Sequence, residues 1–204
     1  MIIEQKTRMK FLRFSADLQQ VAKVEKKKRH LEETKDIVFA NIDFLPFKSY
    51  TNIVEGNALE IDWESVVPKD KLNYIIGNPP FVGANGVSKS QKQELINLFG
   101  EKSNAGILDY VGGWYAKSAI LINDTNIRCA FVSTNSISQG EQVSVLWDFL
   151  LKKNISIDFA YKTFVWNSEA KEKAKVHCII IGFSSVKQSK LILFDKDNKE
   201  INHW

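Results

Sequence analysis

The sequence predicts an α/β fold in which helices cover a mostly parallel β-sheet. Short, almost continuously apolar runs, such as residues 72–77, are typical of strands that are buried on both faces. These runs alternate with segments of helical spacing, which is the pattern of strand–helix–strand units. The final apolar runs follow one another with no helix between them, and this predicts an antiparallel pair of strands at one edge.

From residue 52 onward, expected strands and helices alternate along the chain. The segment "SKSQKQELINLFG" (88–100) has a serine-rich start, helical spacing and a final glycine, so it carries both end signals of a helix. Glycines 112 and 113 predict that the following helix packs closely against a neighbour. Expected strands lie at the start of 52–63 and at 72–77, 127–134, 155–164, 175–184 and 190–194, and expected helices at 88–100, 106–124 and 140–154.

The first 50 residues differ from the rest. Residues 5–34 are rich in charge and free of Gly and Pro, which predicts a helix, and residues 36–50 are apolar but irregular. The basic run Lys23–His30 has glutamates interleaved and around it, so a solvated helix face is favoured over a phosphate contact. The chain therefore divides into a helical and irregular segment, 1–50, and an α/β part, 51–204.

Composition narrows the function classes. Hydrophobic residues make up 44% and charged residues 25%, as in ordinary soluble proteins, and no apolar run could span a bilayer or form a signal peptide. Cys129 and Cys178 lie in apolar runs and have no CxxC partner, so we expect reduced thiols, no metal site and a cytoplasmic protein. The net charge of +4 is compatible with a nucleic-acid partner but does not establish one.

The stretch "NYIIGNPPFVG" (73–83) holds two of the four prolines of the chain, directly after an expected buried strand. Pro79 pushes Asn78 out of the helical region, and Pro79 and Pro80 fix φ and lack N–H donors. The carbonyls of Asn78 and Pro79 are thus held rigidly, with the side-chain oxygen of Asn78 as a further acceptor. A preorganised cluster of acceptors beside the ring of Phe81 follows from this geometry.

Such a cluster suits a planar amine with two N–H groups, and the exocyclic amine of adenine fits this description. Two acceptors that draw on its hydrogens favour a pyramidal nitrogen, which can then attack a methyl sulfonium. The base must leave the duplex to be reached, and stacking on Phe81 would hold it there. The alternative is a plain turn, because Asn-Pro and Pro-Pro are common in loops.

"GNPPF" after "YII" resembles the catalytic motif of class I S-adenosylmethionine-dependent amino-methyltransferases that act on adenine in DNA. The resemblance continues, in order, through blocks between about residues 50 and 184. These blocks are similar to one branch, the large bifunctional type II restriction–modification proteins, and they are "NIVEGNALEIDW", "LDYVGGWYAKSA", "FVSTNSISQGEQV" and "KTFVWNSEAKEKAKVHCIIIGFS".

The resemblance implies roles for matching residues. Asn78 and the Pro79 carbonyl would bind the target amine, with Pro80 stiffening the turn, and Phe81 would stack on the flipped adenine. Phe164 in "KTFVW" would contact the same base, with Trp166 as an alternative ring.

The resemblance also implies S-adenosylmethionine as the methyl donor. Asn57 in "GNAL", where many relatives of the family carry Asp, would contact the adenine ring of that donor. Gly77 would let the backbone pass close to it, and Asp109 would line its pocket, unless it serves only as a helix N-terminal carboxylate.

The family's first strands and its Gly-rich loop are not found in this sequence, since "GANG" (83–86) follows the catalytic turn instead of opening a domain. The resemblance therefore implies an incomplete Rossmann-like class I methyltransferase sheet, with 51–204 as the C-terminal half of a catalytic domain.

We expect double-stranded DNA as a partner, and possible completion by a missing N-terminal half or by other restriction–modification subunits. Two alternatives stay open: an inactive remnant or nucleic-acid-binding module, and a methyltransferase that acts on RNA or protein.

Overall fold

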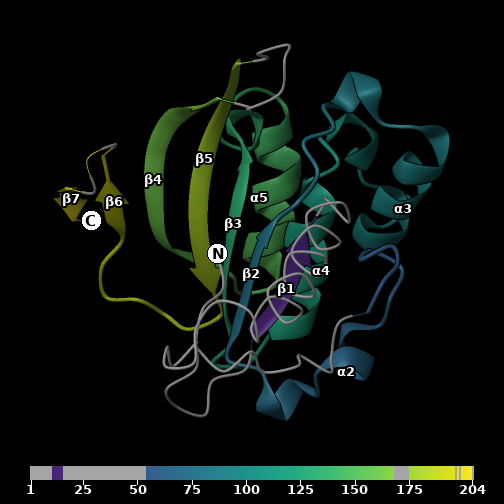
Figure 1. Ribbon diagram of the computed structural model, residues 1–204, viewed down its shortest axis with the longest axis horizontal. Helices are drawn as coiled ribbons and strands as arrows, with labels where there is room; N and C mark the ends of the chain where they lie inside the picture. The colour runs from purple at the N-terminus through teal and green to yellow at the C-terminus, as the bar shows by residue number, and fades with distance from the viewer. Residues whose placement is uncertain (1–10, 16–53, 168–174, 196, 198, 204) are drawn as a thin grey trace, which may run out of the picture.

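Seven strands form one sheet, in the order β1-β2-β3-β5-β4-β6-β7, within the residues that the structure describes (Figure 1). The computed structural model describes residues 11–15, 54–167, 175–195, 197 and 199–203. The strands are β1 (Phe11–Ser15), β2 (Tyr74–Asn78), β3 (Arg128–Thr134), β4 (Ser156–Asn167), β5 (Lys175–Ser184), β6 (Ile192–Phe194) and β7 (Glu200–His203).

Four α-helices lie between these strands in the described part of the chain. They are α2 (Trp63–Val66), α3 (Lys89–Phe99), α4 (Gly112–Ile122) and α5 (Gln142–Lys152), with short 3₁₀ turns η1 (Lys69–Lys71), η2 (Ala84–Gly86), η3 (Ala105–Ile107) and η4 (Asn135–Ser138). The two end signals expected for α3 are confirmed. Ser88 and Gln91 form a reciprocal capping box, and Gly100 ends the helix at φ 96°.

The first three strands of the sheet run parallel and the next is reversed. β1 pairs with β2 and β2 with β3 in parallel, whereas β5 is antiparallel to both β3 and β4. The expected antiparallel pair is therefore confirmed as β4 and β5. It is not the last pair of the sheet, because β6 adds in parallel to β4 and β7 adds in antiparallel to β6.

The helix predicted for residues 5–34 is wrong at Phe11–Ser15, which form β1. Pairing with β2, from Phe11 opposite Tyr74 to Ser15 opposite Asn78, decides the conformation there. Such a ladder joins segments about 60 residues apart, so local charge and the lack of Gly and Pro cannot reveal it. The first 50 residues thus supply a strand beside β2, and the other residues of 5–34 lie outside the described part.

Two further expectations need correction. Val54 and Glu55 are not in a strand, and residues 52 and 53 lie outside the described part, so no strand is seen in "NIVEG". The helix expected at 106–124 begins only at Gly112, because η3 and a turn around Asp109 precede it. That turn contacts the loop that follows β2, through Asp109 and Tyr110.

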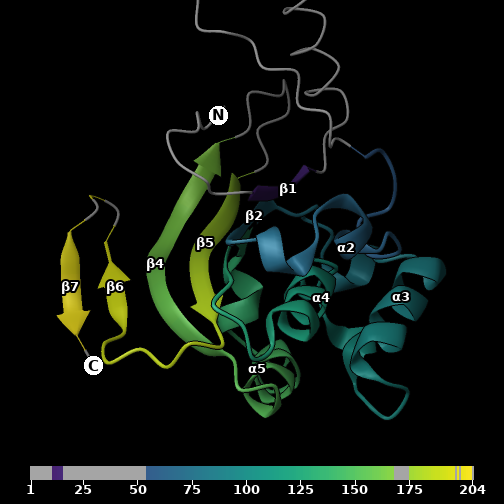
Figure 2. The same cartoon turned by 90° about the horizontal axis from the view of Figure 1, so that it is seen from below.

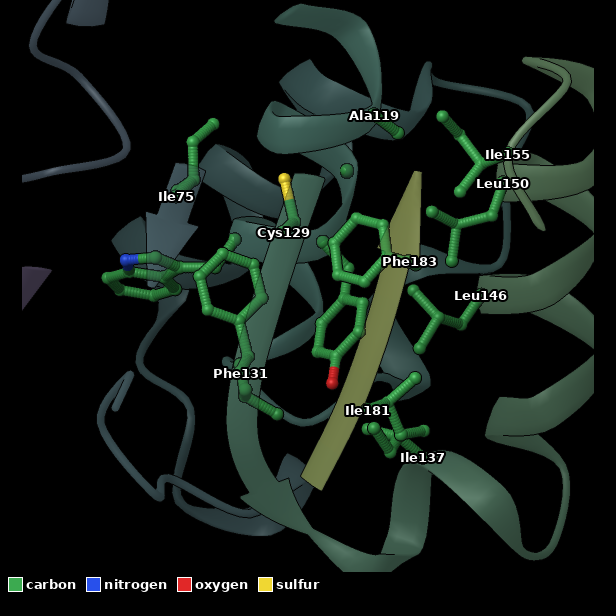
Figure 3. Packing of buried hydrophobic residues seen from close by; sticks show 14 of the residues in the cluster. Ile75, Ala119, Cys129, Phe131, Ile137, Leu146, Leu150, Ile155, Ile181 and Phe183 are labelled. Atoms are coloured by element: carbon green, nitrogen blue, oxygen red, sulfur yellow. The ribbon is translucent and has the colours of Figure 1, made fainter. Parts of the chain in front are cut away.

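Helices α4 and α5 pack on one face of β3 and β5, and the core lies between them (Figures 1 and 2). Alternate residues of β3 point into this core, including Cys129 and the fully buried Phe131. Figure 3 shows Phe131, Phe183 and the α5 residues Leu146 and Leu150 converging there. Tyr115 of α4 stacks on Phe183 with ring centroids 5.1 Å apart. These contacts fix α4 rigidly against the sheet.

Candidate active site

The Asn-Pro-Pro-Phe turn lies at the carboxyl end of β2. Asn78 is the last residue of the strand and is exposed, Pro79 is buried, and Pro80 and Phe81 are half-buried. β1 and β3 run parallel to β2, so their carboxyl ends share this edge of the sheet. Ligands of open α/β sheets bind at this edge.

Hydrogen bonds fix the residues that directly follow the motif, Val82 and Ala84. The Val82 amide donates to the Pro80 carbonyl at 3.1 Å, and the Val82 carbonyl accepts from the Tyr110 amide at 2.9 Å. The Ala84 amide donates to Oδ1 of Asp109 at 2.8 Å. No hydrogen bond within the described residues uses the Pro79 carbonyl or the Asn78 side chain, so no described residue occupies these two acceptors.

Asp109 joins four separate segments. Besides Ala84, its Oδ1 accepts from Nε2 of Gln142 at 3.0 Å, and its Oδ2 accepts from Oγ1 of Thr134 at 2.9 Å and from the hydroxyl of Ser136. The Asp109 amide in turn donates to Oε1 of Gln142 at 2.7 Å. The side chain thereby connects the loop that follows β2, the end of β3, η4 and the start of α5.

Asp109 is held as a carboxylate by these donors. The residue is only 6% exposed, and burial by itself raises the pKa of Asp109. The hydrogen bonds from Ser136, Gln142, Thr134 and Ala84 outweigh burial and hold the pKa below its ordinary value. Both carboxylate oxygens of Asp109 already accept hydrogen bonds from the protein. The geometry therefore favours a positioning role for Asp109 over the direct contact with the methyl donor that the resemblance implied.

Tyr110 lies between the loop that follows β2 and the turn that contains Asn57. Its hydroxyl donates to a Glu94 carboxylate oxygen, and the Asn57 side chain lies near enough to lower the pKa of Tyr110 slightly. Burial and the Glu94 carboxylate raise the pKa of Tyr110, so the phenol stays protonated. The same residue that holds Val82 through its backbone therefore reaches the predicted donor-side residue through its side chain.

Asn57 begins a tight turn. Its Oδ1 accepts from the Leu59 amide at 3.0 Å, and its carbonyl accepts from the amides of Glu60 and Ile61, both at 3.0 Å. The indole N–H of Trp63 donates to the Ala58 carbonyl at 2.7 Å. The side chain of Asn57 is half-buried and its orientation is fixed by these bonds.

The structure does not bring Phe164 next to Phe81. Phe164 pairs with Cys178, which pairs with Thr134 at the end of β3, so Phe164 does lie at the carboxyl edge. β3 and β5 separate β2 from β4, and three strand spacings amount to roughly 14 Å. Phe164 lines a cavity of about 740 Å³ together with Phe159 and other residues. The side chain of Trp166 lies outside the described residues.

Sequence reasoning missed Tyr110, Thr134, Ser136 and Gln142, which hold the loop after β2 directly or through Asp109, and Lys117, which donates to carbonyls of the turn after Asn57. The blocks "LDYVGGWYAKSA" and "FVSTNSISQGEQV" contain these residues, but the resemblance assigned no role to any of them. In the described ranges, no cluster of three or more His, Cys, Asp or Glu side chains could hold a metal ion. No described helix has the length and apolar character needed to cross a membrane.

Comparisons with known proteins agree on the family. The sequence profile of the family described as MmeI, DNA-methyltransferase domain, matches residues 4–195. DNA methyltransferase A of Bacillus subtilis (strain 168) is 38% identical over 163 residues, which are 78% of this chain and 18% of that protein.

A solved structure of the type IIL restriction–modification enzyme MmeI in complex with DNA is 44% identical. It superposes with a TM-score of 0.69 over 86% of this chain and 23% of that chain, so the present chain spans about a fifth of the length of these relatives. Within the residues that the structure describes, the sheet is therefore an incomplete Rossmann-like sheet of the class I methyltransferase type. The chain belongs to the family of MmeI-type DNA-methyltransferase domains.

Proposed function

We propose that this chain carries the target-base side of an adenine-specific DNA methyltransferase of a restriction–modification system. The observation that carries the proposal is the bonding pattern of the Asn-Pro-Pro-Phe turn. Hydrogen bonds fix Val82 and Ala84, yet leave the Asn78 side chain and the Pro79 carbonyl unused by described residues. Two fixed acceptors beside a half-buried ring, Phe81, match a flat amine.

The chemistry follows from these groups. The Asn78 side-chain oxygen and the Pro79 carbonyl accept the two hydrogens of the adenine exocyclic amine and localise its lone pair. Because the acceptors are fixed before the base arrives, little reorganisation is needed at the moment of transfer. Phe81 stacks on the extruded base and offsets part of the energy of unstacking. No strong general base is required, since the amine loses its proton after the methyl group has been transferred.

S-adenosylmethionine is the proposed donor, and when bound it supplies an electrophilic methyl group on sulfur. The described donor-side residues fit an adenine ring in one respect. Oδ1 of Asn57 accepts from Leu59 and keeps a second lone pair, so it can accept from an adenine amine. Gly77 in β2 is the proposed point where the backbone passes close to the methyl donor. Asp109 is proposed to act only through the loops that it positions, without touching the methyl donor.

Duplex DNA and the remainder of a methyltransferase domain are the proposed partners, since the chain spans 18% and 23% of the two relatives. Both cysteines are buried free thiols, which agrees with action in the cytoplasm. Phe164 is proposed to contact the base from its separate position on β4, which requires the extruded base or the DNA backbone to extend across β3 and β5.

A chimera tests the proposal. The matching 163-residue segment of the Bacillus subtilis relative is replaced by this chain, and methyl transfer is measured on duplex DNA, RNA and protein. The chain alone is assayed in parallel. Transfer to adenine in DNA that depends on Asn78 supports the proposal. Transfer to RNA or protein supports the alternative substrate, and a chimera that binds DNA without transfer supports an inactive remnant.

A further inference from the structure

Lys117 lies near the middle of α4 and donates three hydrogen bonds to the turn that follows Asn57. Its Nζ is 3.0 Å from the Ala58 carbonyl, 2.7 Å from the Leu59 carbonyl and 2.5 Å from the Ile61 carbonyl. An ammonium group has three N–H donors, so these three carbonyls use all of them. Lys117 thus uses its three donors to fix a backbone turn, while the nearby carboxylates of Asp62 and Glu60 favour its charged form.

Two further contacts bring this turn onto the same face of α4. Gly113 lies one helical turn before Lys117, and a Cβ atom placed on it would be 2.6 Å from Cδ1 of Leu59. Nζ of Lys117 also lies 5.3 Å from the centroid of the Trp63 ring. The absent side chain at 113 and the long side chain at 117 together seat residues 58–61 against the helix.

The residues just before the same helix hold the catalytic loop. Asp109 binds the Ala84 amide and the Tyr110 amide binds the Val82 carbonyl, both at less than 3 Å. α4 is itself packed into the core through Tyr115, which is fully buried. One rigid helix therefore supports the acceptor loop at its start and the donor-side turn along its side.

We propose that α4 sets the spacing between the two halves of the reaction centre, with Lys117 as the positioning residue of the donor half. This inference rests on the proposed function, because it takes the turn after Asn57 to be the donor side. It goes further by assigning a role to a residue that contacts neither the base nor the donor. If Lys117 only supported the fold, its loss would destabilise the turn after Asn57 and the loop after β2 alike.

The first measurement is local order, read by hydrogen exchange on the full chain. Lys117→Met removes the three donors but keeps the length of the side chain. The amides of Glu60 and Ile61, which bond to the Asn57 carbonyl, should exchange about tenfold faster or more, whereas the Ala84 amide should keep its protection. Lys117→Arg, which keeps charge and donors, should restore most of the protection.

Lys153→Met is the matched control. Nζ of Lys153 also lies 5.3 Å from an aromatic centroid, that of Phe149, but it donates to none of the carbonyls of residues 58–61. It should leave Glu60 and Ile61 unchanged. Equal protection of these two amides in the wild type and Lys117→Met overturns the proposal, as does an equal loss at Ala84.

The second measurement is S-adenosylmethionine affinity, by calorimetry on the same proteins. Lys117→Met should raise Kd about tenfold, with Lys117→Arg close to the wild type, and should raise KM for the donor more than it lowers kcat. Unchanged affinity overturns the proposal. A wild-type chain that binds no donor refutes donor binding by this chain, and hence that part of the proposed function, while the exchange experiment still decides the positioning role.

Discussion

The carboxylate of Asp109 accepts a hydrogen bond from the Ala84 amide at 2.8 Å, across 25 positions of sequence. This bond attaches the loop that follows the Asn-Pro-Pro-Phe motif to the residues that precede α4. The motif thus owes its geometry to two sources. Its prolines restrict the backbone locally, and Asp109 fixes where the restricted loop lies relative to the sheet.

Asn78→Ala should abolish methyl transfer with little effect on the fold. The side chain is exposed and bonds to no described residue, so the free energy of unfolding should change by no more than about 0.5 kcal/mol. In the proposed mechanism its loss removes an acceptor of the amine hydrogens, so kcat should fall by about a hundredfold or more. Single-turnover methylation together with urea unfolding measures both effects.

Asn85→Ala is the control for this variant, because Asn85 is an exposed asparagine in the same loop. It should retain nearly full activity. A similar loss in both variants would show that the loop, and not the Asn78 amide, is what matters.

Asp109→Asn should destabilise the protein and slow methyl transfer together. The amide places a donor where Thr134, Ser136 or Gln142 now meets an acceptor, which leaves buried polar groups unpaired at a cost of about 1–3 kcal/mol. Asp148→Asn is the comparison, since Asp148 is exposed and paired only with Lys152 at the surface. Urea unfolding and kcat should both change in the first variant and neither in the second.

The contribution of Asp109 should also depend on pH. Its folded-state pKa lies below the ordinary value of 3.8, so its stabilising effect is fully present above about pH 4 and is lost as pH falls through the folded pKa. The difference in unfolding free energy between the wild type and Asp109→Asn should therefore be constant near neutral pH and shrink below about pH 4. A difference that grows on acidification would contradict the assigned charge state.

Gly113→Ala should weaken donor binding more than it weakens the fold. The new Cβ would lie 2.6 Å from Cδ1 of Leu59 and 3.1 Å from Cδ2 of Leu95, so the turn after Asn57 must move. Alanine gains about 1 kcal/mol of helix propensity, which offsets part of this overpacking. Calorimetry should show S-adenosylmethionine affinity reduced several-fold, with a net loss of stability of at most about 2 kcal/mol.

Gly106→Ala serves as the reference for that experiment, since no atom lies within 4 Å of the position its Cβ would take. It should bind the donor like the wild type. An unchanged affinity in both variants would argue that the turn after Asn57 does not touch the donor.

Phe81→Ala should weaken extrusion of the target base. Stacking on one aromatic ring contributes about 1–3 kcal/mol per base, so the rise in 2-aminopurine fluorescence that accompanies extrusion at the target position should be smaller in this variant. Ile107→Ala, at an exposed apolar residue outside the turn, should leave the signal unchanged. An undiminished signal in Phe81→Ala would assign the stacking to another ring.

Local sequence signals predicted the elements that are locally determined. Ser88 and Gly100 mark the two ends of α3, and the apolar runs give β2, β3, β4 and β5. β1 was missed because its conformation depends on a ladder with β2, and the short α2 and β7 lack a periodic pattern long enough to detect.

The candidate site likewise consists of residues that a local sequence motif reveals and residues that only the fold brings together. The Asn-Pro-Pro-Phe motif was visible because its residues are contiguous and their geometry is local. The hydrogen bonds from Gln142 to Asp109 and from Lys117 to Leu59 span 33 and 58 positions, so no short pattern encodes them. Only the fold shows that one helix joins the two loops.

The decisive measurement is mass spectrometry of nucleosides from duplex DNA methylated by the chimera that carries this chain. The bonding pattern around Asn78 and Pro79 predicts methyl groups on the exocyclic nitrogen of adenine, and predicts that they disappear in Asn78→Ala while Asn85→Ala retains them. Methyl groups on cytosine, or adenine methylation that survives Asn78→Ala, would contradict it.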